Sequence, residues 1–444
     1  MRGFPLKLSD LPASLRQITL PRVALVRQHF PSDRIDSVET ALRRELDARG
    51  VRRLVQPGQT VAITAGSRGI DRIVELLKTL VSYLRAGGAE PFLVPAMGSH
   101  AGATAEGQVQ LLKKYGITPQ SVGAEIRSSM DVVELGRTPE GIRVLVDRIA
   151  WQADRIVVVN RVKPHTAFHG PIESGLLKMI LIGLGKHEGA QYYHRLILER
   201  GFESVLRPVA EFVLASGKIA FGVALVENAY DQLAHLEVIH PQEFFRREQE
   251  LLALARRLMP RLPVRSADVL VVDQIGKDIS GSGMDTNVVG RKRYAPPGTD
   301  LPEITRIVVR GLTEKTLGNA TGLGLADVVC FRAIANLDYR ATAINCLTAS
   351  HPFGARIPIC CADDRTAIHV AAATCPVQNP QNLRLIRIRD TLHLEHAYVS
   401  EAIIRELSGR PDIEVGSDLR PLSFDNDGML IPEFVPTDSG DRSR

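Results

Sequence analysis

Cysteine is scarce in this sequence and forms no pattern. Of 444 residues only five are cysteine, all from Cys330 onward, and no C-x-x-C pair occurs among them. An odd and unpaired set argues against a disulfide framework and against a tetrahedral zinc site. We therefore expect a protein of a reducing compartment, the cytoplasm.

Long hydrophobic runs are lacking as well. No stretch reaches the roughly 18 uncharged apolar residues of a membrane span, and the most apolar one, around Leu176–Leu184, contains Lys178. The first residues, MRGFPLKLSD, do not form the apolar core of a signal peptide. We expect a soluble chain with no membrane partner.

Aromatic residues and excess charge are also low. Aromatics make up 5%, and the 55 Lys and Arg exceed the 50 Asp and Glu by only five charges, with no long basic run. Without a basic patch or a stacking surface, nucleic-acid binding is not expected. The hydrophobic content of 44% is that of a globular protein, and the length allows two or three domains.

Familiar catalytic motifs are absent too. The sequence contains no H-E-x-x-H and no G-x-S-x-G, so the common hydrolase chemistries lack support. The run GLGLAD at 322–327 is rich in glycine, but it precedes a predicted strand. A dinucleotide fingerprint needs a strand before its glycines and a helix after them. We interpret this run as a turn.

What the sequence does contain is an alternation of strand and helix patterns. Apolar runs at Val61–Thr64, Pro91–Ala96 and Arg155–Asn160 predict buried strands. Apolar residues recur at helical spacing over 73–84, and Thr104 is placed to cap a helix that ends near Tyr115. This order predicts an α/β fold with a parallel sheet covered by helices.

A second series of strands begins after Pro260 and Pro263, which stop a charged helix over 241–259. Its first strand is ADVLVVD, at Ala267–Asp273. We therefore predict two α/β domains with mainly parallel sheets, one over 1–262 and one over 263–444.

Ligands in open α/β sheets bind beyond the carboxyl ends of the strands, so the loops after the strands are the candidate site. His100 and His165 each follow a predicted strand and suit proton transfer near neutral pH. The loop Gly66–Gly69 links a strand to a helix, where free backbone N–H groups favour an anion such as a mononucleotide phosphate or a carboxylate. A simple strand-to-helix turn is an equal alternative for that loop.

Lys178 stands in the apolar run Leu176–Ile182. Burial of an unpaired ammonium is costly and lowers its pKa. One interpretation is a lysine that extends to solvent or pairs with Glu173. The other is a lysine kept partly neutral for covalent attachment of a group.

Two segments resemble the nickel-pincer-nucleotide-dependent lactate racemase superfamily. One is Gly98-Ser99-His100 with the helix start that follows it. The other is Val162-Lys163-Pro164-His165, then Lys178, and then His194 at a distance of 194 − 178 = 16 residues. The resemblance is good over about 58–200 and loose beyond.

The resemblance implies a cofactor and a reaction. In that family a lysine holds a pyridinium mononucleotide through a thioamide; two sulfurs and a carbon of this cofactor bind nickel, and a histidine completes the site. Carried over, Lys178 would attach the cofactor, His194 would bind nickel, and His100 and His165 would be catalytic. Cofactor-biosynthesis proteins would be partners.

The predicted domains take their roles from the same resemblance. The first would bind the cofactor, with Ser67 and Gly69 contacting it, and would carry the catalytic residues. The second would close over the substrate, with the active site in the cleft between the two.

The departures from the family lie on the substrate side. Of the Asp-x-x-Arg-Pro loop after the first strand only Arg68 remains, and the glutamine and lysine that follow Asp-x-Asn are replaced by Gly290 and Arg293. We therefore expect a substrate other than lactate, with Arg68, helped by Arg293 or alternatively Arg291, binding a carboxylate.

The predicted function is a nickel-pincer-dependent isomerase. It would act as a racemase or epimerase that inverts a hydroxyl-bearing carbon of a 2-hydroxy acid or a sugar-type substrate by transient hydride transfer. The alternatives are a nicotinamide-dependent dehydrogenase and a non-catalytic nickel or cofactor carrier. The absent glycine fingerprint disfavours the dehydrogenase, and the two histidines favour the enzyme over the carrier.

Overall fold

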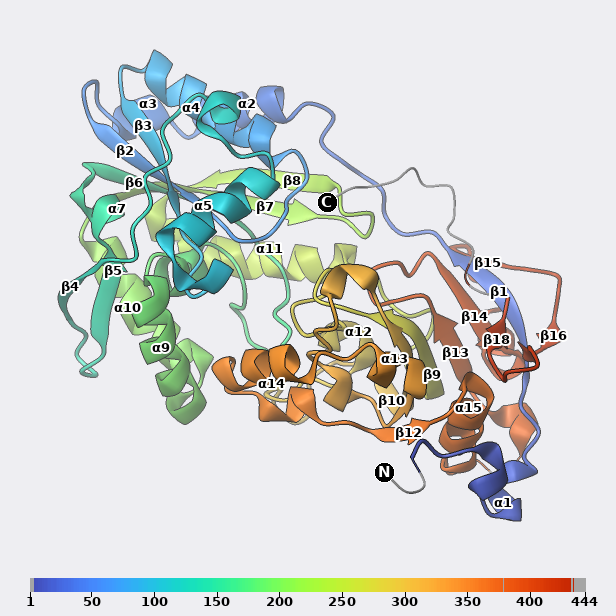
Figure 1. Ribbon diagram of the computed structural model, residues 1–444. Coiled ribbons are helices and arrows are strands. Elements are labelled where there is room, and N and C mark those ends of the chain that lie inside the picture. The colour runs from blue at the N-terminus through green and yellow to red at the C-terminus, as the bar shows by residue number, and fades with distance from the viewer. Residues whose placement is uncertain (1–3, 378, 433, 435–444) are drawn as a thin grey trace. The chain divides into compact units, whose positions relative to one another are not determined.

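The structure, a computed structural model, describes residues 4–377, 379–432 and 434 (Figure 1). The chain forms two compact units. The central unit comprises Pro31–Met259; the terminal unit comprises the described residues up to Phe30 together with those from Pro260 onward. The break at Pro260 lies close to the boundary predicted near residue 262. The first 30 residues differ from the prediction, because they belong with the C-terminal part of the chain.

The central unit is built on a five-stranded sheet in the order β3-β2-β6-β7-β8. Strands β3, β2, β6 and β7 are parallel, and β8 is antiparallel to β7. The carboxyl ends of the four parallel strands therefore lie at one edge of the sheet. The strands are β2 (Thr60–Ala65), β3 (Glu90–Pro95), β6 (Arg155–Arg161), β7 (Ile219–Glu227) and β8 (Leu233–Ile239).

Helices cover both faces of this sheet. Successive strand residues alternate between two cores: Val61 and Ile63 belong to one, and Ala62 belongs to the other. Helices α2 (Val38–Ala48) and α4 (Ile73–Ala86) pack on the first face. Helices α8 (Leu176–Lys178), α10 (Phe202–Ala215) and α11 (Phe244–Leu258) pack on the second.

Shorter elements complete the central unit. A hairpin of β4 (Val132–Arg137) and β5 (Arg143–Asp147) forms a separate two-stranded sheet. The remaining helices are α3 (Val51–Leu54), α5 (Ala105–Lys114), α6 (Pro119–Val122), α7 (Arg148–Gln152) and α9 (Lys186–Arg200). Thr104 caps α5 as predicted, because its hydroxyl accepts a hydrogen bond from the N–H of Gly107 at 3.0 Å.

The terminal unit contains a nine-stranded sheet whose main path is β12-β11-β10-β9-β13-β14-β1-β15, with β16 also paired to β1. The strands from β12 to β13 are parallel, and β14, β1, β15 and β16 are antiparallel to their neighbours. In Figure 1 the blue strand β1 lies beside the red strands β14 and β15. This pairing explains why the start of the chain belongs to the terminal unit.

The elements of the terminal unit are as follows: α1 (Ala13–Arg16), β1 (Arg22–Gln28), β9 (Ser266–Ile275), α12 (Thr286–Val289), β10 (Glu303–Leu312), β11 (Val328–Cys330), α13 (Phe331–Ala335), α14 (Tyr339–Thr348), β12 (Ile359–Cys361), α15 (Asp364–Ala373), β13 (Leu385–Ile388), β14 (His396–Ser400), α16 (Glu401–Leu407), β15 (Ile413–Val415), β16 (Arg420–Pro421), β17 (Ser423–Phe424) and β18 (Leu430–Ile431). The five cysteines are free and buried there.

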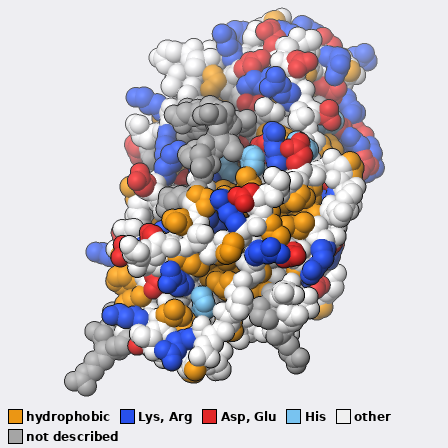
Figure 2. All heavy atoms as spheres, turned by 90° about the vertical axis from the view of Figure 1, so that its right-hand side faces the viewer, with side chains coloured by type: hydrophobic (Ala, Val, Ile, Leu, Met, Phe, Trp, Pro, Cys, Tyr) orange, Lys and Arg blue, Asp and Glu red, His pale blue; other side chains and the backbone are white. Residues whose placement is uncertain are grey.

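The antiparallel end of the nine-stranded sheet carries exposed apolar side chains, among them Leu25 and Val415. Figure 2 views the molecule from the side where β1 and β15 lie in Figure 1, and it shows hydrophobic side chains gathered among lysines and arginines.

Both units combine a largely parallel sheet with helices, which confirms the predicted α/β class. Among the described helices, none is long and apolar enough to cross a membrane.

Candidate functional site

Loops from three parallel strands of the central unit meet at the carboxyl edge of its sheet. The loop after β2 contains Ser67, and the loop after β3 contains His100. The imidazole Nδ1 of His100 forms a short hydrogen bond with the Ser67 hydroxyl. His100 itself is exposed. The structure therefore brings together two residues that the sequence assigned to one site.

The glycine loop after β2 also contacts the segment that carries Lys178. A Cβ atom placed on Gly66 would lie 3.3 Å from the Met179 side chain, which follows Lys178 directly. At the end of β6, the Asn160 side-chain amide donates to the Gly175 carbonyl at 2.7 Å, just before α8. The loop after β2 and the end of β6 thus both lie against the start of the Lys178 segment.

The Lys178 segment contains a π-helix. Helix α8 ends at Lys178, a π-helical turn spans Met179–Gly183, and α9 begins at Lys186. Such wide turns inside helices occur frequently at functional sites. A Cβ on Gly183 would lie 2.8 Å from the Ala96 carbonyl, so glycine is needed for the π-helix to approach the end of β3. Sequence periodicity did not reveal this turn.

The charge state of Lys178 is shifted by its surroundings. Desolvation, aided by the positive charge of Arg68 and opposed by the negative charge of Glu173, lowers the pKa of Lys178 to about 8. A fraction of the amine is therefore neutral near pH 7.5, which is the nucleophilic form. This favours the second interpretation of the lysine, and electrostatic contact links Lys178 to both Arg68 and Glu173.

His194 lies on α9 and is exposed. Desolvation by the surrounding protein and the nearby charge of Lys178 lower the pKa of His194 below the usual value for an imidazole. A neutral ring keeps a nitrogen lone pair for a metal ion. The electrostatic coupling of His194 to Lys178 agrees with their assignment to one site.

The loop that carries His165 is held by a buried carboxylate. Glu173 accepts hydrogen bonds from the backbone N–H groups of His165 (2.5 Å) and Gly170 (3.2 Å), and it pairs with Arg256 of α11 at 2.6 Å. His169 is a further ion-pair partner at 3.3 Å. Glu173, which one interpretation of the sequence pairs with Lys178, thus also fixes the His165 loop.

The ring of His165 is oriented by its own loop. Its Nδ1 accepts hydrogen bonds from the backbone N–H groups of Ala167 (3.0 Å) and Phe168 (3.3 Å), and the ring stacks on Phe168 with centroids 4.7 Å apart. Because Nδ1 is an acceptor, the neutral ring carries its hydrogen on Nε2. His165 is thus set to donate a hydrogen bond from Nε2.

A second buried carboxylate lies at the start of α8. Glu248 of α11 accepts a hydrogen bond from the Leu177 N–H at 3.0 Å, and burial raises its pKa to about 7. A Cβ on Gly175 would lie 2.5 Å from the Glu248 carboxyl carbon, so any larger residue there would displace this carboxyl group. Nothing local in the sequence indicated this contact, because 248 − 175 = 73 residues separate the two.

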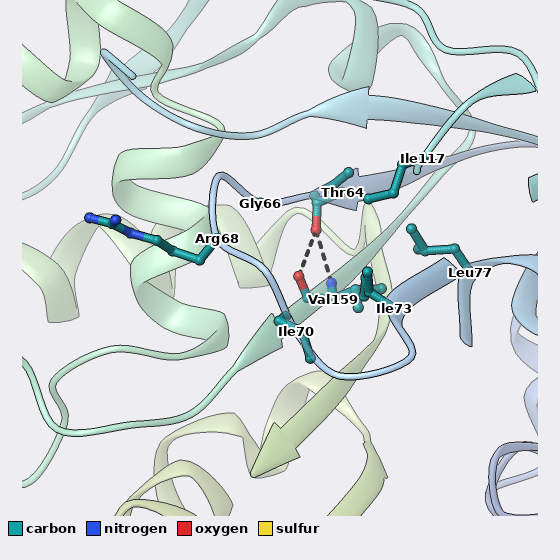
Figure 3. A pocket seen from close by; sticks show the side chains of 9 residues that line it. Thr64, Gly66, Arg68, Ile70, Ile73, Leu77, Ile117 and Val159 are labelled. Carbon is teal, nitrogen blue, oxygen red and sulfur yellow. Dashed lines mark hydrogen bonds between the residues drawn. The ribbon is translucent and has the colours of Figure 1, made fainter. Parts of the chain in front are cut away.

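Arg68 points away from a small cavity beneath its own loop. Figure 3 shows the cavity lined by apolar side chains such as Ile70 and Leu77, with the Arg68 guanidinium extending in the other direction. The Thr64 hydroxyl closes the wall through hydrogen bonds with the backbone of Val159 at 2.9 and 3.3 Å. The exposed guanidinium is therefore available to an anionic ligand.

The remaining two predicted site residues are Gly69 and Arg293. Gly69 lies in the same loop as Ser67, with room for a Cβ only in van der Waals contact with the Tyr115 ring. Arg293 belongs to the terminal unit, where it is exposed and its guanidinium lies 5.4 Å from the centre of the Tyr294 ring. Of the eight predicted site residues, the structure thus places seven in the central unit and Arg293 in the other.

Within the described ranges, no three His, Cys, Asp or Glu side chains are grouped so as to hold a metal ion. His194 would have to act as a single imidazole ligand, and one such ligand is what the resemblance to the pincer-dependent family implies. The donor set fits that cofactor: a lysine with a partly neutral amine and one neutral imidazole, electrostatically coupled to each other.

The central unit is thus an α/β protein with a lysine and three histidines in or beside the loops and helix at one sheet edge. Residues 16–204 match the model of the lactate racemase N-terminal domain. This part of the chain is therefore similar to a lactate racemase N-terminal domain.

Two solved structures are similar to this chain. One is a structural-genomics protein from Thermotoga maritima, with 17% identity, a TM-score of 0.45, and coverage of 59% of this chain and 69% of that one. The other is the lactate racemase apoprotein from Thermoanaerobacterium thermosaccharolyticum, with 15% identity, a TM-score of 0.45, and coverage of 86% and 85%. No curated protein matches.

Proposed function

We propose that this protein is a nickel-pincer-nucleotide-dependent isomerase, a racemase or epimerase of a 2-hydroxy acid or sugar-type substrate. The observation that carries the proposal is the grouping of a partly neutral Lys178 with Arg68 and His194 at the sheet edge that also carries His100. The match of residues 16–204 to the lactate racemase N-terminal domain supports it.

In this proposal each residue has a separate task. Lys178 would hold the cofactor through its amine, and the Ser67–Gly69 loop would contact it. His194 would provide one nitrogen ligand to nickel. The bound cofactor supplies reversible acceptance of a hydride. Arg68 would bind the substrate carboxylate through its exposed guanidinium.

The two remaining histidines would move the hydroxyl proton. Inversion of a carbinol carbon presents the hydroxyl group in two directions, and one base cannot reach both within hydrogen-bond distance, about 2.6–3.2 Å. His100 would serve one enantiomer and His165 the other. For His165 to accept a proton on Nε2, its Nδ1 must carry hydrogen, so the bonds from Ala167 and Phe168 must be released in that step.

The test is covalent loading. The chain would be co-expressed with cofactor-making enzymes and analysed by intact mass and nickel content. We expect a mass addition that is lost in Lys178→Ala and kept in the control Lys113→Ala, an exposed lysine of α5. An unmodified, nickel-free protein that racemises its substrate would overturn the proposal. NAD-dependent oxidation by such a protein would identify a dehydrogenase instead.

The nickel ligand is tested separately. His194→Ala should lose nickel while it retains the covalent addition, because attachment through Lys178 does not need the imidazole. His187→Ala, on the same helix, is the matched control and should retain both. Loss of nickel in His187→Ala alone would show that His194 is not the ligand.

A further inference from the structure

A second lysine of the same segment is fully buried. The side chain of Lys186 has no exposed surface, and its backbone adopts a left-handed conformation with φ +54°. Both features are costly for lysine, since a buried ammonium loses hydration and a side chain strains a positive φ. A lysine is therefore unfavourable at this position unless its ammonium group has a specific structural or functional role.

The ammonium of Lys186 joins three separate elements. It donates hydrogen bonds to the Pro95 carbonyl at the end of β3 (2.7 Å) and to the Gln108 side-chain oxygen on α5 (3.2 Å), and it pairs with the buried carboxylate of Asp147 at 3.1 Å. Two of these contacts are hydrogen bonds, and the contact with Asp147 is a buried ion pair. Lys186 is also the first residue of α9, which carries His194.

Gln108 extends this network to the His100 loop. The side chain is fully buried, and its amide nitrogen donates to the Gly98 carbonyl at 3.0 Å. With the ammonium at its oxygen and a carbonyl at its nitrogen, the amide has one favourable orientation. A Cβ on Gly98 would lie 3.0 Å from Ile182 of the π-helix, so the His100 loop also rests directly on the segment that follows Lys178.

We propose that Lys186, with Asp147 and Gln108, is a positioning residue that fixes the His100 loop relative to the Lys178–His194 segment. Stability alone does not account for the network, because an apolar replacement of a buried ion pair is commonly neutral or stabilising. The ammonium adds directional hydrogen bonds, which hold the end of β3 and α5 in defined positions relative to the start of α9.

The inference rests on the proposed role of His100, and its test has a readout that needs no cofactor. Gln108→Leu and Lys186→Met in the full-length chain would be compared with the exposed-lysine control Lys113→Met. Backbone hydrogen exchange over 97–104 should rise about tenfold in both variants, as expected for one or two lost hydrogen bonds. Exchange in β7 and β8 should stay unchanged in all three.

The loaded enzyme gives a second readout. We expect kcat to fall at least tenfold in Gln108→Leu, with KM, nickel content and the mass addition retained. Unchanged exchange over 97–104, or an equal rise across the whole central unit, would overturn the positioning role. If Lys186→Met does not fold, Gln108→Leu decides alone. Absence of cofactor loading in every protein would count against the proposed function only, since the exchange result stands independently.

Discussion

Single charges near Lys178 set its protonation. Arg68 disfavours the ammonium, and Glu173 favours it, while desolvation moves the pKa furthest. Arg68 is exposed and Glu173 is buried, so the two charges differ in how far solvent screens them. A nucleophilic lysine and a carboxylate-binding arginine would thus influence each other.

The first prediction concerns this coupling. In Arg68→Gln, the loss of the positive charge should raise the pKa of Lys178 from about 8 towards 10.5, by about half a unit to one unit. The pKa would be measured from the pH dependence of Lys178 acetylation, followed by mass spectrometry. Arg85→Gln, an exposed arginine of α4, is the control and should leave the midpoint in place. A fall of the midpoint in Arg68→Gln would refute the coupling.

The second prediction concerns the two histidines. Glutamine can donate a hydrogen bond from a position close to that of Nε2, but it cannot take up a proton. His100→Gln and His165→Gln should therefore each lower kcat/KM by about 10²–10⁴, the usual loss for a general acid or base. Steady-state kinetics with verified cofactor loading would measure this. Near-normal turnover in His165→Gln would restrict His165 to hydrogen-bond donation and contradict the two-histidine pair.

At the scale of elements, α8 shows how a three-residue helix is held in place. Its N-terminal N–H groups have no partners within the helix, and the Glu248 carboxylate accepts from Leu177 there. Gly175 leaves space for that carboxylate, and Asn160 holds the Gly175 carbonyl. The position of Lys178 thus depends on α11 and β6, which are distant in sequence.

The third prediction follows from the raised pKa of Glu248. With a pKa of about 7 in the folded protein against 4.5 as the ordinary value, the folded state binds more protons between these limits. The free energy of unfolding should therefore fall as the pH rises through this window. Glu248→Gln keeps an acceptor for Leu177 and removes the titration.

Denaturant unfolding at pH 5 and pH 8 provides the measurement. Between pH 5 and pH 8 the free energy of unfolding of Glu248→Gln should rise by about 2.5 kcal/mol relative to that of the wild type, as the shift implies. Glu250→Gln, an exposed neighbour on α11, should show no such gain. An equal effect of both substitutions would show that Glu248 does not titrate in this range.

At the scale of the whole molecule, the chain makes two units from three segments. Strand β1 pairs with β14 over five residues and also with β15 and β16. The terminal unit therefore needs the first 30 residues, whereas the central unit is continuous. All predicted site residues except Arg293 lie in that continuous part.

The fourth prediction is that residues 31–259 fold alone. The fragment retains both core clusters of the five-stranded sheet, so it should unfold cooperatively and give dispersed amide resonances. A fragment 260–444 leaves the edge of β14 unpaired and should aggregate. Thermal unfolding and light scattering would test both, and a well-folded, monomeric 260–444 would disprove the need for β1.

The sequence by itself determined the α/β class, the strands β2, β3, β6 and β9 and the loops that follow them. These are local properties: apolar runs of strand length, helical periodicity and a capping threonine. Because parallel strands end at one sheet edge, the proximity of the Ser67 and His100 loops also followed from the sequence.

Tertiary structure decided the rest, because it depends on contacts between residues far apart in the chain. The pairing of β1 with β14 assigned the N-terminal segment to the other unit, and no local pattern encodes that partner. Glu248 under Gly175 and Lys186 between β3 and α5 look like ordinary charged residues in the sequence. Only the fold buries them, and burial strengthens the hydrogen bonds and ion pairs through which these charged groups position the site.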